Sequence, residues 1–339
     1  MNIFYGICGE GLGHALRSYA VIKMLNAEGF VVHVFTFGEA YNFYMNEKYP
    51  HLHKIEGLLL DHGNNKANLL GTARNFLRFF MNMKKNLRDI PDLAPKFCIT
   101  DFEPLIPRIA GKLKLPCISI DNQHKFLCTA RGLPFDLKLY SWAARFFIKW
   151  WIPLPRPYFQ IVTTFHDFES TEKCIKANVI VRDEILRSTP TVGDYILVYV
   201  KKSMSEKVLD VLSKIDDKFI VYGLNPKEYS NMTFKEISNE SFVRDLAGCK
   251  RLICTAGNQL VGEAKFLGKP LLVIPLKNQT EQMVNAWYVK SAGIGDYCSI
   301  DNFDERVVSN FLVKDYKISD KTNGLDKVMS ALNDFVIRV

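Results

Sequence analysis

The stretch TAGNQLVGEAKFLGKPLLVIPLKNQTEQMVNA, residues 255–286, contains the features that decide the fold. It follows an apolar segment at 251–254, which we expect to be a buried strand, and it begins with a turn around Gly257. A helix carrying Glu263 comes next, and then a second apolar strand at 271–274. This order predicts two parallel strands whose βα loops open at the same edge of a sheet.

The turn before the helix is suited to binding an anion. Gly257 lets the backbone approach closely, and the start of the helix offers unpaired N–H groups with a partial positive charge. The residues expected to hold phosphate are Thr255, Ala256, Gly257 and Asn258. Glu263 lies where a carboxylate can reach two vicinal ribose hydroxyls. Glu281 and Gln282 offer acceptors and a donor for the hydroxyls of a sugar.

This run resembles the donor-binding signature of GT-B glycosyltransferases, and most of all the inverting group that includes the peptidoglycan N-acetylglucosaminyltransferase and the UDP-glucuronosyltransferase-like enzymes. The matching residues are Gly257, Glu263, Gly268-Lys269-Pro270, Pro275, Glu281-Gln282 and Asn285-Ala286. The resemblance implies a nucleotide-sugar substrate and no cofactor or metal. Many plant-type members have a His at the phosphate turn, where this chain has Thr255 and Ala256. Backbone amides are therefore expected to be the main partners of the diphosphate.

The length of 339 residues suits two domains, and strands alternate with helices in both halves. The expected fold class is therefore α/β, with two Rossmann-like parallel-sheet domains facing a cleft. Turn-forming residues at 187–194 place the boundary between an acceptor-binding domain, 1–188, and a donor-binding domain, 189–339. The helix expected at 326–336 could pack on either domain. Central strands are expected at 2–8, 31–37, 97–100, 117–120, 161–164, 195–200, 219–222, 251–254 and 271–274.

Composition limits the class of protein. The chain is 48% hydrophobic and 24% charged, as in an ordinary soluble protein. Its eight cysteines are scattered singly, which favours a reduced, cytoplasmic chain. The first residues read as a strand rather than a signal peptide, and no apolar run reaches the roughly 18 residues of a membrane span. The net charge of +8 falls mostly on residues 1–183, but no nucleic-acid-binding pattern accompanies it.

The amino-terminal loop, Gly9-Glu10-Gly11-Leu12-Gly13-His14, differs from both common glycine-rich motifs. The dinucleotide fingerprint needs a glycine where His14 stands, and the loop lacks the G-K-S/T ending of a P-loop. The loop therefore brings one imidazole to the start of a helix. In the resembled family a glycine-rich loop followed by His contributes to acceptor binding or deprotonation. The resemblance thus implies a base at His14, and Gly11 and Gly13 of the same loop are expected to contact the acceptor. The alternative is that His14 only caps the helix or lines the cleft.

Acidic and amide side chains follow two further strands. Asp101 and Glu103 come after the strand at 97–100, where either could orient His14 or serve as the base itself. Asp121, Asn122 and Gln123 end the next strand and are expected to contact the acceptor. The alternative is that these residues only shape turns, since Asp and Asn often end strands.

Two segments mix aromatic and basic side chains, at 137–159 and at 70–88. Such a mixture suits the headgroup region of an anionic membrane, and the alternative is a core helix with a solvated basic face. The first interpretation predicts a peripheral protein on the inner face of the membrane.

Together these features predict an inverting, metal-independent transferase that moves a sugar from a UDP-sugar to a hydroxyl of a lipid-linked or cell-surface glycan. Two alternatives remain open: a UDP-sugar epimerase or hydrolase of the same fold, and a non-catalytic sugar-nucleotide binding protein.

Overall fold

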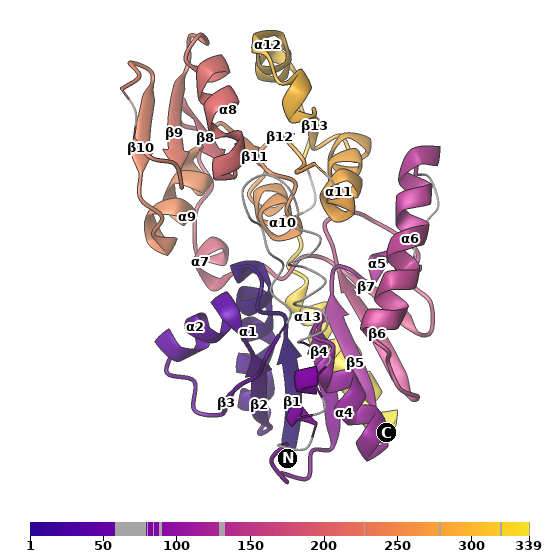
Figure 1. Ribbon diagram of the computed structural model, residues 1–339. Coiled ribbons are helices and arrows are strands. Elements are labelled where there is room, and N and C mark those ends of the chain that lie inside the picture. Colours follow the sequence, from indigo (N-terminus) through magenta and orange to yellow (C-terminus); the bar gives the residue numbers. More distant parts are fainter. Residues whose placement is uncertain are drawn as a thin grey trace.

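A computed structural model of the chain describes residues 1–57, 79, 81–83, 85–87, 90–128, 133–226, 228–277, 279–318 and 321–338. It shows two parallel sheets, each flanked by helices, in two units that lie one above the other in Figure 1. The expected α/β fold with two parallel-sheet units is therefore confirmed.

The lower unit in Figure 1 contains the first sheet, whose described strands follow the order β3-β2-β1-β4-β5-β6-β7. Their bounds are β1 (Asn2–Ile7), β2 (Val31–Thr36), β3 (Leu52–Lys54), β4 (Phe97–Asp101), β5 (Cys117–Asp121), β6 (Tyr158–Thr163) and β7 (Cys174–Ala177). All neighbouring strands are parallel. The order reverses between β1 and β4, so their carboxyl ends form the crevice where open α/β sheets bind ligands.

Helices follow most of these strands. Their bounds are α1 (Leu12–Ala27), α2 (Gly38–Asn46), α4 (Leu105–Leu113), α5 (Lys125–Cys128) and α6 (Phe135–Trp151), with α7 (Asp183–Leu186) on the way to the second unit. Gly11 precedes α1 with φ of 82°, a backbone conformation that glycine adopts without steric cost. The glycine at position 9 is needed for another reason, because a Cβ there would lie 2.3 Å from the carbonyl oxygen of Phe37.

The upper unit contains the second sheet, in the order β10-β9-β8-β11-β12-β13. Its strands are β8 (Tyr195–Tyr199), β9 (Lys218–Tyr222), β10 (Met232–Lys235), β11 (Arg251–Cys254), β12 (Leu271–Val273) and β13 (Gly295–Tyr297). Its helices are α8 (Ser205–Leu212), α9 (Asn239–Gly248), α10 (Asn258–Phe266), α11 (Thr280–Ser291) and α12 (Glu305–Val313). Its order reverses between β8 and β11, so the turn into α10 lies at the second crevice.

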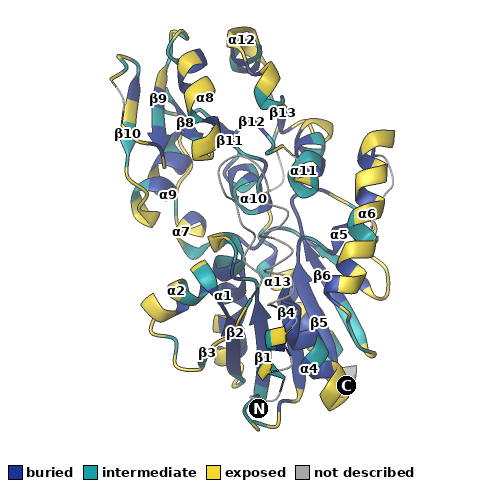
Figure 2. Cartoon of the chain, in the orientation of Figure 1, coloured by how far each residue is buried: buried dark blue, intermediate teal, exposed yellow. Residues whose placement is uncertain are grey.

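The central strands are buried on both faces, which explains why apolar runs revealed them. Every residue of β4 and β5 is buried, whereas β3, β10 and β13 contain half-buried or exposed residues (Figure 2). A continuous apolar run is typical of a parallel strand covered by helices on both sides. The short edge strands lack this signal, and the sequence did not predict them.

The last helix, α13 (Leu325–Arg338), returns to the first unit. Val328 and Leu332 are fully buried in the same core as Ile3 and Ile161. The choice that the sequence left open is therefore settled, because residues far beyond position 188 complete the core of the first unit.

Two further expectations concern helices and cysteines. Of the helix expected at 70–88, the described residues 79, 81–83, 85 and 86 are helical, and most of the others lie outside the described residues. The expectation that every cysteine is reduced is wrong for one pair, because Cys128 and Cys174 form a disulfide that joins α5 to β7. Partners 46 residues apart leave no local sequence pattern. Among the described helices, none has the length and apolar character needed to cross a membrane.

Candidate active site

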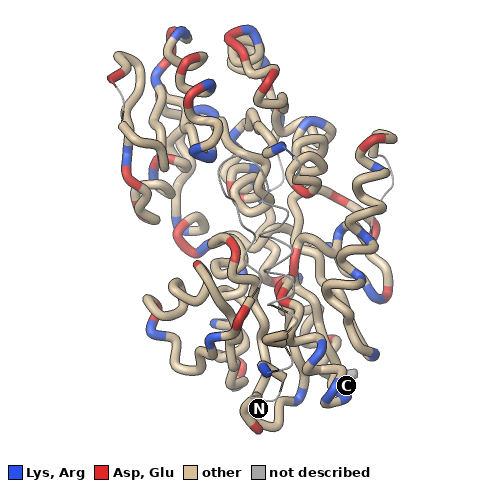
Figure 3. Tube along the Cα trace, in the orientation of Figure 1, with Lys and Arg blue, Asp and Glu red and all other residues tan. Residues whose placement is uncertain are grey.

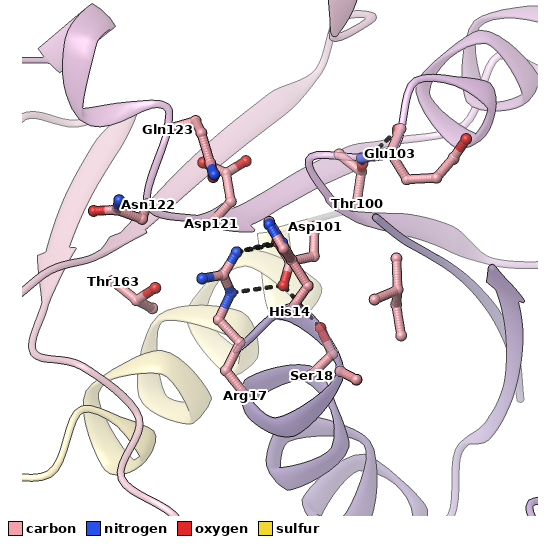
Figure 4. Close-up of polar contacts among 12 residues, drawn as sticks. His14, Arg17, Ser18, Thr100, Asp101, Glu103, Asp121, Asn122, Gln123 and Thr163 are labelled. Carbon is pink, nitrogen blue, oxygen red and sulfur yellow. Dashed lines mark hydrogen bonds and ion pairs between the residues drawn. The ribbon is translucent and has the colours of Figure 1, made fainter. Parts of the chain in front are cut away.

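A polar cluster lies at the carboxyl edge of the first sheet, where β1 and β4 end side by side (Figure 4). His14 is in the first turn of α1, and Arg17 follows one helical turn later, so both project from the same face. Both contact Asp101, the last residue of β4. Nδ1 of His14 is 2.7 Å from Oδ1 of Asp101, and Nε of Arg17 donates to Oδ2 at 2.6 Å. Ser18 donates to the same Oδ2 at 3.0 Å.

The position of the His14 proton follows from its neighbours. Nδ1 also lies 2.7 Å from Nη2 of Arg17, and this Nη2 donates to Oδ1 of Asp101. A proton on Nδ1 lets both nitrogens donate to Oδ1, and the Nδ1–Nη2 contact is then one between two donors. Without that proton Nη2 could donate to Nδ1, but Nδ1 would oppose the ionised carboxylate, which is the stronger acceptor. We therefore assign the proton to Nδ1. The lone pair is then on Nε2, which has no hydrogen-bond partner among the described residues, and the side chain is 13% exposed.

Asp101 and Arg17 form a buried ion pair that fixes this arrangement. Asp101 is fully buried and Arg17 is 5% exposed. Burial by itself raises the pKa of Asp101, but the positive charge of Arg17 and the contact with His14 lower it below its ordinary value. Burial opposes the charge of Arg17 as well, and Asp101 raises the pKa of the guanidinium above its usual range. Asp101 is therefore an ionised acceptor that orients the His14 ring.

Glu103, the other carboxylate predicted near His14, has a different environment. Its Oε1 accepts from the backbone N–H of Leu105 at 2.7 Å, and its Oε2 accepts from that of Ile106 at 2.9 Å. In Figure 4 it lies beyond Thr100 and points away from His14. Burial raises the pKa of Glu103 to about 7, although the two N–H groups favour the charged form. The structure thus uses Glu103 to satisfy the start of α4 rather than to contact His14.

Asp121 belongs to a local network at the end of β5. Its Oδ2 accepts from Ser119 at 2.7 Å and contacts Nδ1 of His124 at 2.6 Å, and its Oδ1 accepts from the backbone N–H of His124 at 2.8 Å. Burial opposes ionisation, but His124 lowers the pKa of Asp121 to about 2. All three side chains are fully buried. For Asp121 the structure shows the turn chemistry that was the alternative to acceptor contact.

The next two residues link the two units. Nδ2 of Asn122 donates to Oε1 of Glu281 at 2.6 Å, and Nε2 of Gln123 donates to Oε2 at 3.2 Å. Glu281 lies in the first turn of α11. Predicted acceptor contacts and a predicted sugar contact thus meet at one seam between the units. Gln282 does not take part, because its Oε1 accepts from the backbone N–H of Leu276 within the second unit.

The predicted phosphate turn lies between β11 and α10. An added Cβ at Gly257 would meet no protein atom within 4 Å, so the backbone there is accessible to a ligand. The N–H of Gly257 donates to the carbonyl oxygen of Thr255 at 2.9 Å. The free N–H groups are therefore those of the first helical residues, beginning with Asn258. The side chain of Asn258 faces the first unit, where Nδ2 donates to the Thr163 carbonyl oxygen at 3.0 Å.

Glu263 is buried and already paired. Nε and Nη2 of Arg182 donate to its two oxygens at 2.8 and 2.7 Å, and Gln259 donates to Oε1 at 2.9 Å. A ribose would have to share these oxygens with Arg182 or displace it. A hollow of about 860 Å³, lined by residues such as Thr191 and Asn239, lies along the linker and α9, away from His14.

Sequence reasoning missed several residues of the candidate site and of the seam. Arg17 could have been found, because it repeats the position of His14 one turn later on α1. Lys125, fully buried at the start of α5, and its partner Asn285 of α11 belong to different units. No local sequence pattern predicts a contact between residues so far apart in the chain. Arg182 was missed for the same reason.

Comparisons with known proteins agree with this architecture. The family model described as glycosyl transferase family 1 matches residues 1–315. An uncharacterized glycosyltransferase of Methanosarcina mazei is 25% identical over 365 aligned residues, which cover 98% of this chain and 95% of that protein.

Solved structures show the same fold at low sequence identity. The glycosyltransferase of kitacinnamycin has a TM-score of 0.67 and 15% identity, with 98% of this chain and 94% of that chain covered. MurG of Acinetobacter baumannii has a TM-score of 0.61 and 12% identity, with 98% and 100% covered. The calicheamicin glycosyltransferase CalG4 has a TM-score of 0.63 and 16% identity, with 92% and 90% covered.

Proposed function

The chain belongs to glycosyl transferase family 1, and on this basis we propose that it transfers a sugar from a UDP-sugar to an acceptor hydroxyl with inversion. The observation that carries the proposal is the His14–Asp101 contact, which leaves Nε2 of an oriented imidazole without a partner among the described residues, at the crevice of the first sheet. An imidazole is well suited to accept a proton near neutral pH.

The proposed reaction is a single displacement. The acceptor oxygen forms a bond to the anomeric carbon and gives its proton to Nε2 of His14. The bond from the anomeric carbon to the phosphate oxygen breaks, and its electron pair stays on the departing UDP. Asp101 stabilises the positive charge that develops on the ring, as a buried carboxylate does beside a catalytic histidine. We propose no part for Glu103 in this step, because its carboxylate accepts from the backbone N–H groups of Leu105 and Ile106.

The donor is proposed to lie in the second unit, across the seam from His14. The first N–H groups of α10 would bind the diphosphate and stabilise the charge that grows on it, without a metal ion. Glu263 is proposed to bind the ribose after Arg182 releases one of the two Glu263 carboxylate oxygens. Glu281 is proposed to contact the sugar. Because Asn122 and Gln123 already hold Glu281, the two units would separate to admit the donor and close again around it.

A first test identifies the donor and the reaction. The thermal stability of the protein should rise with UDP-sugars more than with GDP- or dTDP-sugars. UDP release should require an acceptor, for which a lipid extract of bacterial membranes is a suitable probe, and it should persist in EDTA. Full turnover without acceptor would instead identify a hydrolase or epimerase. Binding without any turnover would identify a sugar-nucleotide binding protein.

The acceptor is proposed to be lipid-linked, because α6 of the first unit presents an apolar surface. Its exposed large hydrophobic side chains are Phe135, Leu139, Tyr140, Trp142, Phe146, Phe147 and Trp150. Basic positions accompany them along the helix, and the helix stands at the side of the molecule (Figures 1 and 3). Aromatic and basic side chains together suit the interface of an anionic membrane.

Sedimentation with vesicles tests this surface. We expect the protein to bind phosphatidylglycerol vesicles, and the double variant Trp142→Ser, Trp150→Ser to bind them about tenfold more weakly, because two exposed aromatic rings no longer insert. Val313→Ser at the end of α12, where the side chain is 82% exposed, is the matched control and should bind normally. Equal binding by all three proteins would remove α6 as the membrane contact.

A further inference from the structure

Lys125 is a buried cation at the seam between the units. It begins α5 and is fully buried. Its Nζ donates to Oδ1 of Asn285 at 2.5 Å and to Oδ1 of Asn122 at 3.2 Å. Both partners are neutral amides, and within the described residues no carboxylate lies at ion-pair distance from Nζ. A buried ammonium without a counter-ion is costly, and an anion bound beside it would offset that cost.

The contacts of Lys125 lead directly to the phosphate turn. Asn285 uses its other amide atom, Nδ2, to donate to the carbonyl oxygen of Ala256 at 2.8 Å. Ala256 lies in the turn that precedes α10, beside Gly257. The side-chain amide of Asn285 thus lies between Nζ of Lys125 and the turn that leads to the free N–H groups at the start of α10. The cation comes from the first unit and the helix start from the second.

Among the described residues, no charged side chain forms an ion pair with Lys125. Asn122 stands between Nζ and Glu281, because its Oδ1 accepts from Lys125 and its Nδ2 donates to Glu281. Burial lowers the pKa of Lys125 to about 8, although Glu281 favours its charged form. Among the described residues, some buried atoms of the seam find no protein hydrogen-bond partner, including Oδ1 of Asn258, Oγ1 of Thr163 and Oε1 of Gln123. Buried polar atoms without a protein partner can bind a water or a ligand; the Thr163 hydroxyl can donate to one, whereas the two amide oxygens accept.

We propose that Lys125 binds the diphosphate of the nucleotide-sugar donor from the opposite unit. Nζ leaves Asn285 and contacts a phosphate oxygen, while the N–H groups at the start of α10 contact the same diphosphate from the other side. Lys125 then supplies the positive charge that Thr255 and Ala256 do not provide at the turn. Because Lys125 and the start of α10 belong to different units, binding of the diphosphate to both would also bring the two units together. This inference rests on the proposed function.

Calorimetric titration with UDP and with uridine tests the proposal. Lys125→Met should weaken UDP binding by about 10- to 100-fold, the range for loss of a charge-assisted hydrogen bond, and leave uridine binding unchanged. Lys125→Gln keeps a polar side chain without the charge and should show the same loss. If circular dichroism shows that Lys125→Met does not fold, the affinity of Lys125→Gln for UDP tests the proposal.

Lys250→Met is the control. Lys250 is half-buried, and its Nζ donates to Oδ1 and Oδ2 of Asp217 at 2.7 and 2.8 Å, at the amino edge of the second sheet. This variant should bind UDP like the wild type. Wild-type affinity for UDP in both Lys125 variants would overturn the inference and leave the proposed function standing. Failure of the wild type to bind UDP, GDP or dTDP would overturn the proposed function and the inference with it.

Discussion

At the scale of single residues, Asp101 matters for stability because Arg17 depends on it. Both are buried, and the guanidinium contacts both carboxylate oxygens. The pKa of Asp101 is lowered in the folded state, so its contribution is complete above its ordinary pKa and is lost as the pH falls through the lowered value. The orientation of His14 and the stability of the fold therefore depend on the same ion pair.

We expect Asp101→Asn to lower the free energy of unfolding by about 3–5 kcal/mol, because a buried charge is left unpaired. Adding Arg17→Met removes that charge and should recover most of the loss. Urea denaturation at pH 7 measures both variants. If the double variant is no more stable than Asp101→Asn alone, the buried ion pair is not the source of the loss.

The pH dependence of donor binding is a second prediction for a single residue. With a pKa of about 8, Lys125 is protonated at pH 7 and mostly neutral at pH 9. UDP is fully charged across this range, since its terminal phosphate titrates near pH 6. The wild-type affinity for UDP should therefore fall by roughly tenfold between pH 7 and pH 9.

The same titration in Lys125→Met should be nearly flat. The charged or titratable groups that face Lys125 are Glu281, Arg17, Asp121 and His166, and the prediction requires that none of them changes charge above pH 7. Asp121 and Arg17 keep their charge there, because His124 lowers the pKa of Asp121 and Asp101 raises that of Arg17. Burial lowers the pKa of His166, so it is already neutral. An equal pH dependence in the variant would assign the titration to another group.

At the scale of secondary structure, α4 shows how the environment of a residue decides its role. Glu103 follows β4 as Asp101 does, and the sequence offered both as partners of His14. Glu103 lies two residues further along the chain than Asp101, and its carboxylate accepts from the backbone N–H groups of Leu105 and Ile106. The sequence placed Glu103 at the correct edge but could not show the direction of its side chain.

We expect Glu103→Ala to destabilise the protein by about 1–2 kcal/mol, because the start of α4 loses the acceptor for two N–H groups. The folded variant should keep its affinity for UDP and its turnover. Thermal denaturation and UDP release measure the two effects separately. A loss of turnover in a variant that remains folded would restore Glu103 to the catalytic group.

At the scale of the whole molecule, sequence and structure agree where local patterns are strong. Apolar runs predicted the central strands, and the glycine-rich loop and Asp101 were correctly placed at one sheet edge because parallel strands share their carboxyl ends. Contacts between distant segments were not predicted. Lys125 with Asn285, Arg182 with Glu263 and Cys128 with Cys174 all depend on how the chain folds back on itself.

The return of α13 to the first unit makes a prediction for the whole fold. Leu332→Ala should lower the free energy of unfolding of the first unit by about 2–5 kcal/mol, as is usual for a buried leucine. A fragment of residues 1–188 should be much less stable than that unit in the full chain, since it lacks Val328 and Leu332. Urea denaturation of both proteins checks this. A fragment as stable as the unit in the full chain would show that α13 contributes little.

The central claim is that His14 removes the proton from the acceptor while the second unit holds the donor. The most direct measurement compares acceptor-dependent UDP release by the wild type and by His14→Ala, over UDP-sugars and a membrane lipid extract. The account predicts that kcat falls by about 10²- to 10⁴-fold in His14→Ala, the usual contribution of a general base, while the dissociation constant for UDP is unchanged. Equal kcat in the two proteins would contradict it.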